Sequence, residues 1–399
     1  MDPTTSRPVL CFVIACLIAG VPGCAADGDP VGTGGSDTGG AGAATADDGG
    51  GGLGVGGRDG PGGQSGVGGQ GGEGVVIDPR AGVYREACDG SAGVFIDHDH
   101  FVDANDENQL LRVYARGQDA APIQTFETSD DIGLDTSDEA DIEGGARLGD
   151  RIYWITSHGR NKNGVLEESR YRFFATDING SVPDVSFEVP GRYESLLEEM
   201  LESSNWLAPH AEVIALLDER SQLDEDTVED LAPKINGTCI EGLAAAPTAT
   251  DAQRLLIGFR NPLYESKAIV VTLLNPDAVL TQQTTPTFGE AILLDLAGLG
   301  VRAMTYSPFH DAVIIVAGAP TADGAFKLYK WKGTAEDPPE LVQDLVVPAD
   351  SSPEAVVVFP DSLYVQVLLD QGTTQINGED CKDGALADQK FTDLILKID

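Results

Sequence analysis

The carboxy-terminal part of the chain repeats a short pattern in which a charged residue precedes a small one and opens an apolar stretch. The copies are Ile142-Glu143-Gly144, Ile240-Glu241-Gly242-Leu243, Val301-Arg302-Ala303-Met304 and Pro353-Glu354-Ala355-Val356. Each copy is followed by a turn and a second short segment rich in branched and aromatic residues, which indicates a strand. Because these units recur without alternating helices, the pattern predicts an all-β fold, namely a β-propeller.

The spacing of the copies predicts the number of blades. Glu241 and Arg302 lie 61 residues apart, and Arg302 and Glu354 lie 52 apart. Between Glu143 and Glu241, segment 193–231 places apolar residues at helical spacing, which predicts an acidic helical insertion into a blade, broken near Pro209. Without it, roughly 280 residues remain for units of this length, so we expect five blades, with six as the alternative.

The first 80 residues differ in composition from the remainder. Residues 1–23 contain an apolar run that is too short to span a bilayer and is typical of a signal peptide. The run ends in Val21-Pro22-Gly23-Cys24, which resembles a bacterial lipobox and predicts a lipid on Cys24. Ordinary secretion with cleavage nearby is the alternative. The Gly-rich segment 24–80 predicts a disordered tether, and residues 81–399 form the propeller domain.

The predicted lipid also predicts a location. Ala25 follows Cys24, and by similarity to Gram-negative lipoproteins the absence of Asp there favours the outer membrane. We therefore expect an extracytoplasmic monomer held to the outer membrane, on either its periplasmic or its surface face. With 25 basic and 65 acidic residues, the net charge of −40 repels phosphate backbones and excludes nucleic acid as a partner.

A propeller must close its ring, and both ends of the domain supply material for this. The last blade leaves room for a strand from Val83 to Cys88 beside its own predicted strands. Exported proteins keep disulfides, and Cys88, Cys239 and Cys381 are the cysteines of the mature domain. A Cys88–Cys381 bond would join the first and last segments; three reduced thiols are the alternative.

Several longer strings carry a resemblance to a known family. They are Phe101–Glu107, Leu111–Tyr114, Ile142–Gly144, Tyr153–Asn161, Leu231–Lys234, Ile240–Ala244 and Ile257–Leu263. On these strings, residues 92–399 resemble an uncharacterised bacterial family, the domain of unknown function 3616. The resemblance implies a propeller-like fold and no known activity.

The repeats also indicate where polar side chains would gather. If a hairpin separates Glu143 from Arg160, and Glu241 from Arg260, acidic and Arg-Asn residues meet at one mouth of the ring. The candidate pocket residues are Glu143, His158, Arg160, Asn161, Glu241, Arg260, Asn261, Arg302 and Glu354.

Two interpretations of this set stay open. In the functional one, Glu143, Glu241 and Glu354 hold a divalent cation such as calcium, the arginines grip an anion and His158 transfers protons. In the structural one, Glu–Arg pairs tie neighbouring blades together.

These interpretations give two hypotheses for function. The first is a binding or scaffold module whose charged mouth meets a small anion, a glycan or a protein. The alternative is a metal-dependent hydrolase of a lactone or phosphoester, because the Glu-Gly strand start is similar to that of metal-dependent lactonase propellers.

Overall fold

The computed structural model describes residues 82–321 and 324–399. All described residues belong to the unit Gly69–Asp399. The predicted signal peptide, the lipid site Cys24 and the whole of the predicted tether thus lie outside the described residues. None of the described helices has the length and hydropathy needed to cross a membrane.

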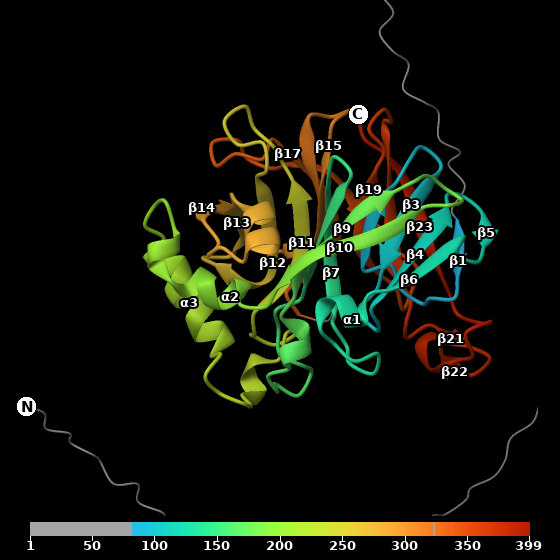
Figure 1. The fold of residues 1–399 in the computed structure, drawn as a ribbon, viewed down its shortest axis with the longest axis horizontal. Helices are drawn as coiled ribbons and strands as arrows, with labels where there is room; N and C mark the ends of the chain where they lie inside the picture. The colour runs from blue at the N-terminus through green and yellow to red at the C-terminus, as the bar shows by residue number, and fades with distance from the viewer. Residues whose placement is uncertain (1–81, 322–323) are drawn as a thin grey trace, which may run out of the picture. The chain divides into compact units, whose positions relative to one another are not determined.

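Five sheets of four or five strands, antiparallel except where β5 joins β1, form the blades of a propeller (Figure 1). Blade 1 contains β2 (Ala92–Phe95), β3 (His100–Ala104), β4 (Leu110–Ala115) and β6 (Gln124–Glu127). Blade 2 contains β7 (Ile142–Leu148), β8 (Arg151–Thr156), β9 (Phe173–Asn179) and β10 (Ser186–Tyr193). Blade 3 contains β11 (Cys239–Ala245), β12 (Leu255–Tyr264), β13 (Lys267–Leu273) and β14 (Phe288–Leu294). Blade 4 contains β15 (Gly300–Ser307), β16 (Ala312–Gly318), β17 (Phe326–Trp331) and β18 (Glu340–Leu345).

Blade 5 closes the ring with strands from both ends of the domain. It contains β19 (Ser352–Val358), β20 (Tyr364–Asp370), β23 (Lys390–Lys397), β1 (Val83–Arg85) and the short β5 (Asp119–Ala120). In this sheet Val83 of β1 lies opposite Thr392 of β23. A disulfide joins Cys88 to Cys381, so the predicted closing strand and the predicted cysteine pair are both found. Cys239 is a buried free cysteine.

The inner strands surround the propeller axis. β2, β7, β11, β15 and β19 contact one another in this order, and β19 contacts β2 again. The ring is therefore closed, and the five-bladed propeller predicted from the sequence is confirmed. Each inner strand begins at the same end of the axis, because all five have the same place and direction in their blades.

The helices lie at the edges of the blades. They are α1 (Ser129–Ile132), α2 (Leu196–Leu201), α3 (Ala211–Ser221) and α4 (Pro276–Gln282). The predicted helical insertion is found as α2 and α3, which are separated around Pro209. It connects β10 to β11 and therefore lies between blades 2 and 3, rather than within one blade as expected.

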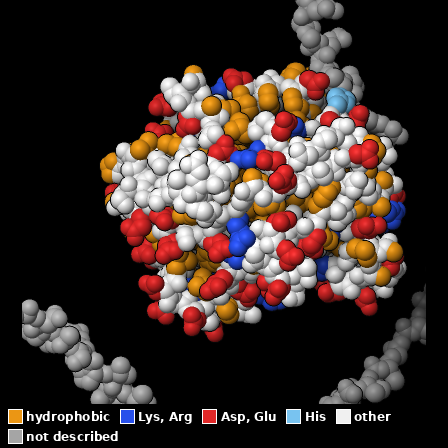
Figure 2. All heavy atoms as spheres, in the orientation of Figure 1, with side chains coloured by type: hydrophobic (Ala, Val, Ile, Leu, Met, Phe, Trp, Pro, Cys, Tyr) orange, Lys and Arg blue, Asp and Glu red, His pale blue; other side chains and the backbone are white. Residues whose placement is uncertain are grey.

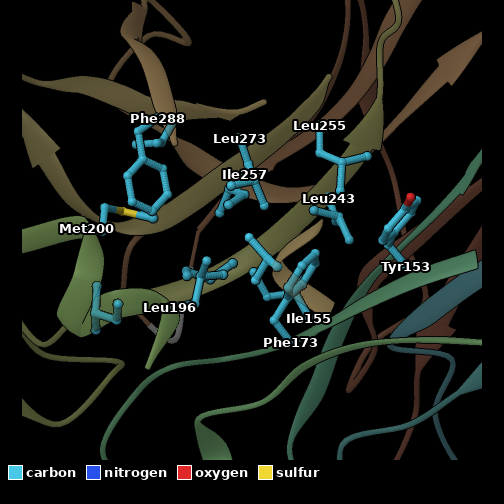
Figure 3. Close-up of a cluster of buried hydrophobic side chains, with 14 of the residues drawn as sticks. Tyr153, Ile155, Phe173, Leu196, Met200, Leu243, Leu255, Ile257, Leu273 and Phe288 are labelled. Carbon is cyan, nitrogen blue, oxygen red and sulfur yellow. The ribbon is translucent and has the colours of Figure 1, made fainter. Parts of the chain in front are cut away.

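Apolar side chains from neighbouring blades interlock to form the core. Figure 3 shows one cluster in which Phe173 of blade 2 and Ile257 of blade 3 meet Leu196 of the insertion. All three side chains are fully buried. Burial of this kind contributes about 25 cal/mol per Å² of apolar surface and fixes the blades against each other. The insertion is therefore part of the core between blades 2 and 3.

A ladder of small strands completes the domain between β20 and β23. It consists of β21 (Gln375–Ile376) and β22 (Glu379–Asp380), followed by the single turn that carries Cys381. Because Cys381 is bonded to Cys88, this segment is covalently held to the start of the domain.

Candidate functional site

The repeated charged residues stand at matching β-bulges of the inner strands. In β7, β11, β15 and β19 the pairing with the next strand skips one residue near the start of the strand. The skipped residues are Glu143, Glu241, Arg302 and Glu354. A bulge leaves one residue out of the ladder and re-aims its side chain. The charged residue of the sequence pattern is therefore the bulged residue of the inner strand in four blades.

These residues form a ring around the axis. In blade 1 the matching place, directly before β2, is held by Ser91. Ser91, Glu143, Glu241 and Glu354 line one narrow space of about 10 Å³, and Arg302 contacts both Glu241 and Glu354. We call these five residues the axial ring and the narrow space the throat. The structure thus brings together side chains that are as much as 263 residues apart in the sequence, from 91 to 354.

Three members of the axial ring pair with each other. The Nη1 atom of Arg302 lies 3.2 Å from Oε2 of Glu241, and its Nη2 forms an ion pair with Glu354. The Nη1 of Arg260 lies 2.8 Å from Oε1 of Glu241. Burial alone would raise the pKa of Glu241, but Arg260 and Arg302 hold it below its ordinary value. In this paired half (Glu241, Arg302, Glu354), ion pairs tie blades 3, 4 and 5 together, as the structural interpretation expected.

The other two members form an open half (Ser91, Glu143). Glu143 makes no hydrogen bond or ion pair with any described residue. Burial, and then the charges of Glu241 and Asp141, raise its pKa well above the ordinary value. The Ser91 side chain is 1% exposed, and its Oγ likewise has no hydrogen-bond partner in the described part of the chain. The polar side chains of the axial ring therefore have ion-pair partners, within the described chain, in the paired half only.

A wider cavity lies at the end of the axis where the inner strands begin. We call this cavity, of about 420 Å³, the acidic mouth. Its carboxylates include Asp106, Asp141, Glu143, Glu241, Glu354 and Asp370. Basic side chains pair with some carboxylates of the mouth. Arg170 donates to Asp141 over 2.9 Å, and Lys382 donates to Glu107, which also lines the mouth, over 2.8 Å. Figure 2 shows that acidic side chains outnumber basic ones on the visible face.

Asp106 is a second carboxylate of the mouth without a hydrogen bond or ion pair among residues 82–321 and 324–399. Burial and the charge of Glu354 raise its pKa well above the ordinary value. Burial also raises the pKa of Glu354, to about 7, against the opposing charge of Arg302. The mouth therefore holds more negative charge than its own cations neutralise.

The opposite end of the axis has a different chemistry. A cavity of about 340 Å³ is lined there by the ends of the inner strands, with Val94, Leu148, Ala245 and Val358 among its apolar walls. The guanidinium of Arg147 reaches it, but donates to the backbone oxygens of the neighbouring blade and stacks 4.7 Å from the ring of Phe95. Glu143, the carboxylate of the axial ring that lacks an ion pair with a described residue, thus lines the acidic mouth and not this opposite cavity.

The structure does not bring all predicted site residues to the mouth. His158 is fully buried, its Nδ1 lies 2.9 Å from the carbonyl of Thr156, and burial lowers its pKa to about 4. Arg160 is buried too, and its guanidinium donates to the carbonyls of Gln222 and Glu225 at the end of the insertion. The expected approach of Arg160 to Glu143 is therefore not found, and His158 is enclosed instead of facing a ligand.

The two predicted asparagines hold loops around the mouth. Asn161 lines the cavity, and its Oδ1 accepts hydrogen bonds from the backbone of Asn163 and Val165. Asn261 is buried and donates to the carbonyls of Pro233 and Pro320. Both side chains are thus engaged by the backbone and shape the rim.

The predicted calcium ligands do not form a metal centre in the described chain. Glu143, Glu241 and Glu354 share the throat, yet no group of three or more His, Cys, Asp or Glu residues among those described could hold a metal ion. Arg302 stands between Glu241 and Glu354 and already neutralises both.

Three residues of the site, Ser91, Asp106 and Asp141, were not predicted from the sequence. Asp106 lies in the segment Asp103–Asn108, in which most side chains carry carboxylate or amide oxygens. This composition was a signal for a polar site. Ser91 precedes a small residue, as the other members of the axial ring do. Because Ser91 carries no charge, it does not match the repeated charged–small pattern.

Comparisons with known proteins find distant similarities in fold. No curated protein matches the chain. The putative oxidoreductase (glucose dehydrogenase) of Thermus theromophilus is 11% identical, with 79% of this chain and 99% of that one covered and a TM-score of 0.39. The PQQ-bound aldose sugar dehydrogenase of Streptomyces coelicolor is 12% identical, with 80% and 100% covered and a TM-score of 0.36. The Swd1 β-propeller domain of Myceliophteria thermophila is 10% identical, with 80% and 100% covered and a TM-score of 0.32.

These likenesses concern the fold alone. The family described as "Protein of unknown function (DUF3616)" matches residues 197–354, from α2 to the start of β19. That match confirms the family resemblance inferred from the sequence.

Proposed function

We propose that this protein is a binding module, held outside the cytoplasm by a lipid on Cys24, whose acidic mouth binds a small cationic ligand. The observation that carries the proposal is the open half of the axial ring. Glu143 faces a cavity and forms no ion pair with a described residue, whereas the equivalent Glu241 forms two. Burial, and then the repulsion between carboxylates, raises the pKa of Glu143 and Asp106, and a positive group in the mouth would oppose both effects.

The paired half narrows the choice of ligand. Three arginines could have gripped an anion: Arg260 and Arg302 already face carboxylates, and Arg160 donates to carbonyls of the insertion. An anion that approached Arg260 or Arg302 would have to break those buried pairs, which typically costs about 3–5 kcal/mol. Lys162 and Lys234 also line the mouth, but its nine carboxylates outnumber its five basic side chains, which favours a cation, and the size of the ligand follows from a cavity of about 420 Å³.

A charge-matched titration tests this proposal. Butylammonium, butanol and butyrate are titrated into the full chain by isothermal calorimetry at low salt, where we expect heat from the cation alone. Glu143→Gln should weaken that binding about tenfold, in line with the ~1.4 kcal/mol that a tenfold change represents. Glu336→Gln is the matched control, because Glu336 is exposed on the loop between β17 and β18, at the other end of the axis.

Two results of this titration would contradict the proposal. Binding of butyrate in preference to butylammonium would refute the cationic mouth, and so would an equal loss in both variants. The anchor is tested on its own by mass spectrometry of the mature amino terminus. An acylated Cys24 is expected, and an unmodified amino terminus would contradict the tether.

A further inference from the structure

We infer that the throat accepts the head of a primary ammonium ion, with Ser91 and Glu143 as its acceptors, so that the ligand is a small primary amine. This inference rests on the proposed function and adds to it the chemical group that is recognised. It concerns the open half of the axial ring, where acceptors are present and donors are missing from the described chain.

The throat is a built site because it contains a buried polar atom with an unmet hydrogen bond. The Oγ of Ser91 has no partner among the described atoms, although its side chain is 1% exposed. Buried hydroxyls in folded proteins are almost always hydrogen-bonded, so an unmet one points to a missing partner. Glu143 and Glu354 line the same space, which places a hydroxyl and two carboxyl groups around one point on the axis.

The size of the throat limits what can enter it. Its volume of about 10 Å³ is close to that of one water-sized probe. A primary ammonium group is of this size, and it carries three N–H donors and no acceptor. A quaternary ammonium has the same charge, but its methyl groups are larger than the throat and leave it no N–H to donate. Size and hydrogen bonding therefore both select the primary amine.

The cavity outside the throat can hold the remainder of such a molecule. The acidic mouth and the throat share Glu143, Glu241 and Glu354 as walls, so an ammonium head in the throat leaves its stem in the mouth. Pro233 and Ile235 give the mouth an apolar wall against which methylene groups can pack. Asp106 lies further out and offers a carboxylate to a second positive group.

The experiment compares two cations of equal charge on the full chain. Butylammonium should bind at least tenfold more tightly than butyltrimethylammonium in calorimetric titrations at pH 8. Ser91→Ala should reduce the affinity for butylammonium about tenfold and leave the affinity for butyltrimethylammonium unchanged, because only the primary amine donates to Oγ. Ser91→Cys retains the bulk with a poor acceptor and should give the same loss, so the test survives if Ser91→Ala unfolds.

Failure of this inference can be told from failure of the proposed function. Equal affinities for the two cations, with Glu143→Gln weakening both, would overturn the throat and leave the cationic mouth intact. Absence of binding by either cation would overturn both. A lysine-containing peptide that binds far more tightly than butylammonium would overturn the small-molecule ligand, while a diamine that gains affinity through Asp106 would support it.

Discussion

The same substitution at two matching positions of the axial ring should change stability in opposite directions. Glu143 and Glu241 occupy equivalent bulges in blades 2 and 3, and each can be replaced by the isosteric Gln. Glu143→Gln removes a buried charge that forms no ion pair with a described residue, so it should stabilise the fold at pH 8. Glu241→Gln removes the acceptor shared by Arg260 and Arg302, so it should destabilise the fold.

The magnitudes follow from the contacts. Removal of a buried charge that forms no ion pair with a described residue should raise the free energy of unfolding at pH 8 by at least about 1 kcal/mol, because a carboxyl whose pKa is raised by a single unit already costs about 1.4 kcal/mol once it is ionised. Loss of one partner from a buried ion-pair network costs about 3–5 kcal/mol, which we expect for Glu241→Gln. The two variants should therefore differ by at least about 4 kcal/mol, the sum of the lower limits.

The pH dependence gives each variant a second signature. The pKa of Glu143 is raised in the folded state, so its ionised form weakens the fold increasingly as pH rises above the unfolded value near 4.5. The benefit of Glu143→Gln should thus vanish by about pH 4. The pKa of Glu241 is lowered, so its stabilisation is present above the unfolded value and is lost as pH falls through the folded value. The cost of Glu241→Gln should shrink at acid pH.

Urea denaturation followed by tryptophan fluorescence measures both effects, because Trp154 and Trp331 are buried in different blades. The slope of unfolding free energy against urea should be unchanged in both variants, since the same surface is exposed. Destabilisation by both substitutions at pH 8 would refute the distinction between the open and paired halves.

Three further results are expected. Removal of the ring-closing disulfide by Cys88→Ser with Cys381→Ser should lower the free energy of unfolding by about 2–5 kcal/mol, and an unchanged urea midpoint would show that β1 closes the ring unaided. Gly300→Ala should destabilise the fold by about 1–3 kcal/mol, because the added Cβ would overlap the carbonyl oxygen of Arg260; wild-type stability would contradict that close approach. Affinity for butylammonium should rise between pH 6 and pH 8, because Glu354, with its pKa raised to about 7 by burial, becomes charged in that interval; calorimetry that shows a fall would contradict a carboxylate site.

The fold could be predicted from the sequence because each blade begins in the same way. The repeated charged–small pair marks the start of an inner strand, and Val83 could be assigned to the last blade because that blade lacked an outer strand. The position of Cys88 and Cys381 at the closure made their pairing one of two alternatives, beside three reduced thiols, and the structure contains the disulfide. Position in a repeat is a strong constraint since every copy must fit the same ring.

The site was only partly predictable, because similar spacing in the sequence led to different structures. Glu241 and Arg260 meet because β12 continues from Leu255 to Tyr264 and carries Arg260 beside the inner strand. In blade 2 the corresponding strand β8 ends at Thr156, so Arg160 lies beyond the strand. Its guanidinium donates to a backbone carbonyl of the insertion instead.

Two more features of the site were invisible in the sequence. The β-bulges that turn the ring members toward the axis depend on the pairing of strands, which residue types alone do not reveal. The importance of Ser91 depends on what its hydroxyl lacks, and an unmet hydrogen bond can be recognised only once its neighbours are known.

In this account, Glu143 acquires a positive partner only when a ligand binds in the mouth. Carbon-detected NMR of the glutamate carboxyl groups in the full chain measures its pKa directly. We expect a value well above the ordinary range in the protein alone, and a clear decrease when butylammonium is added. An ordinary pKa that does not change with the amine would contradict this account.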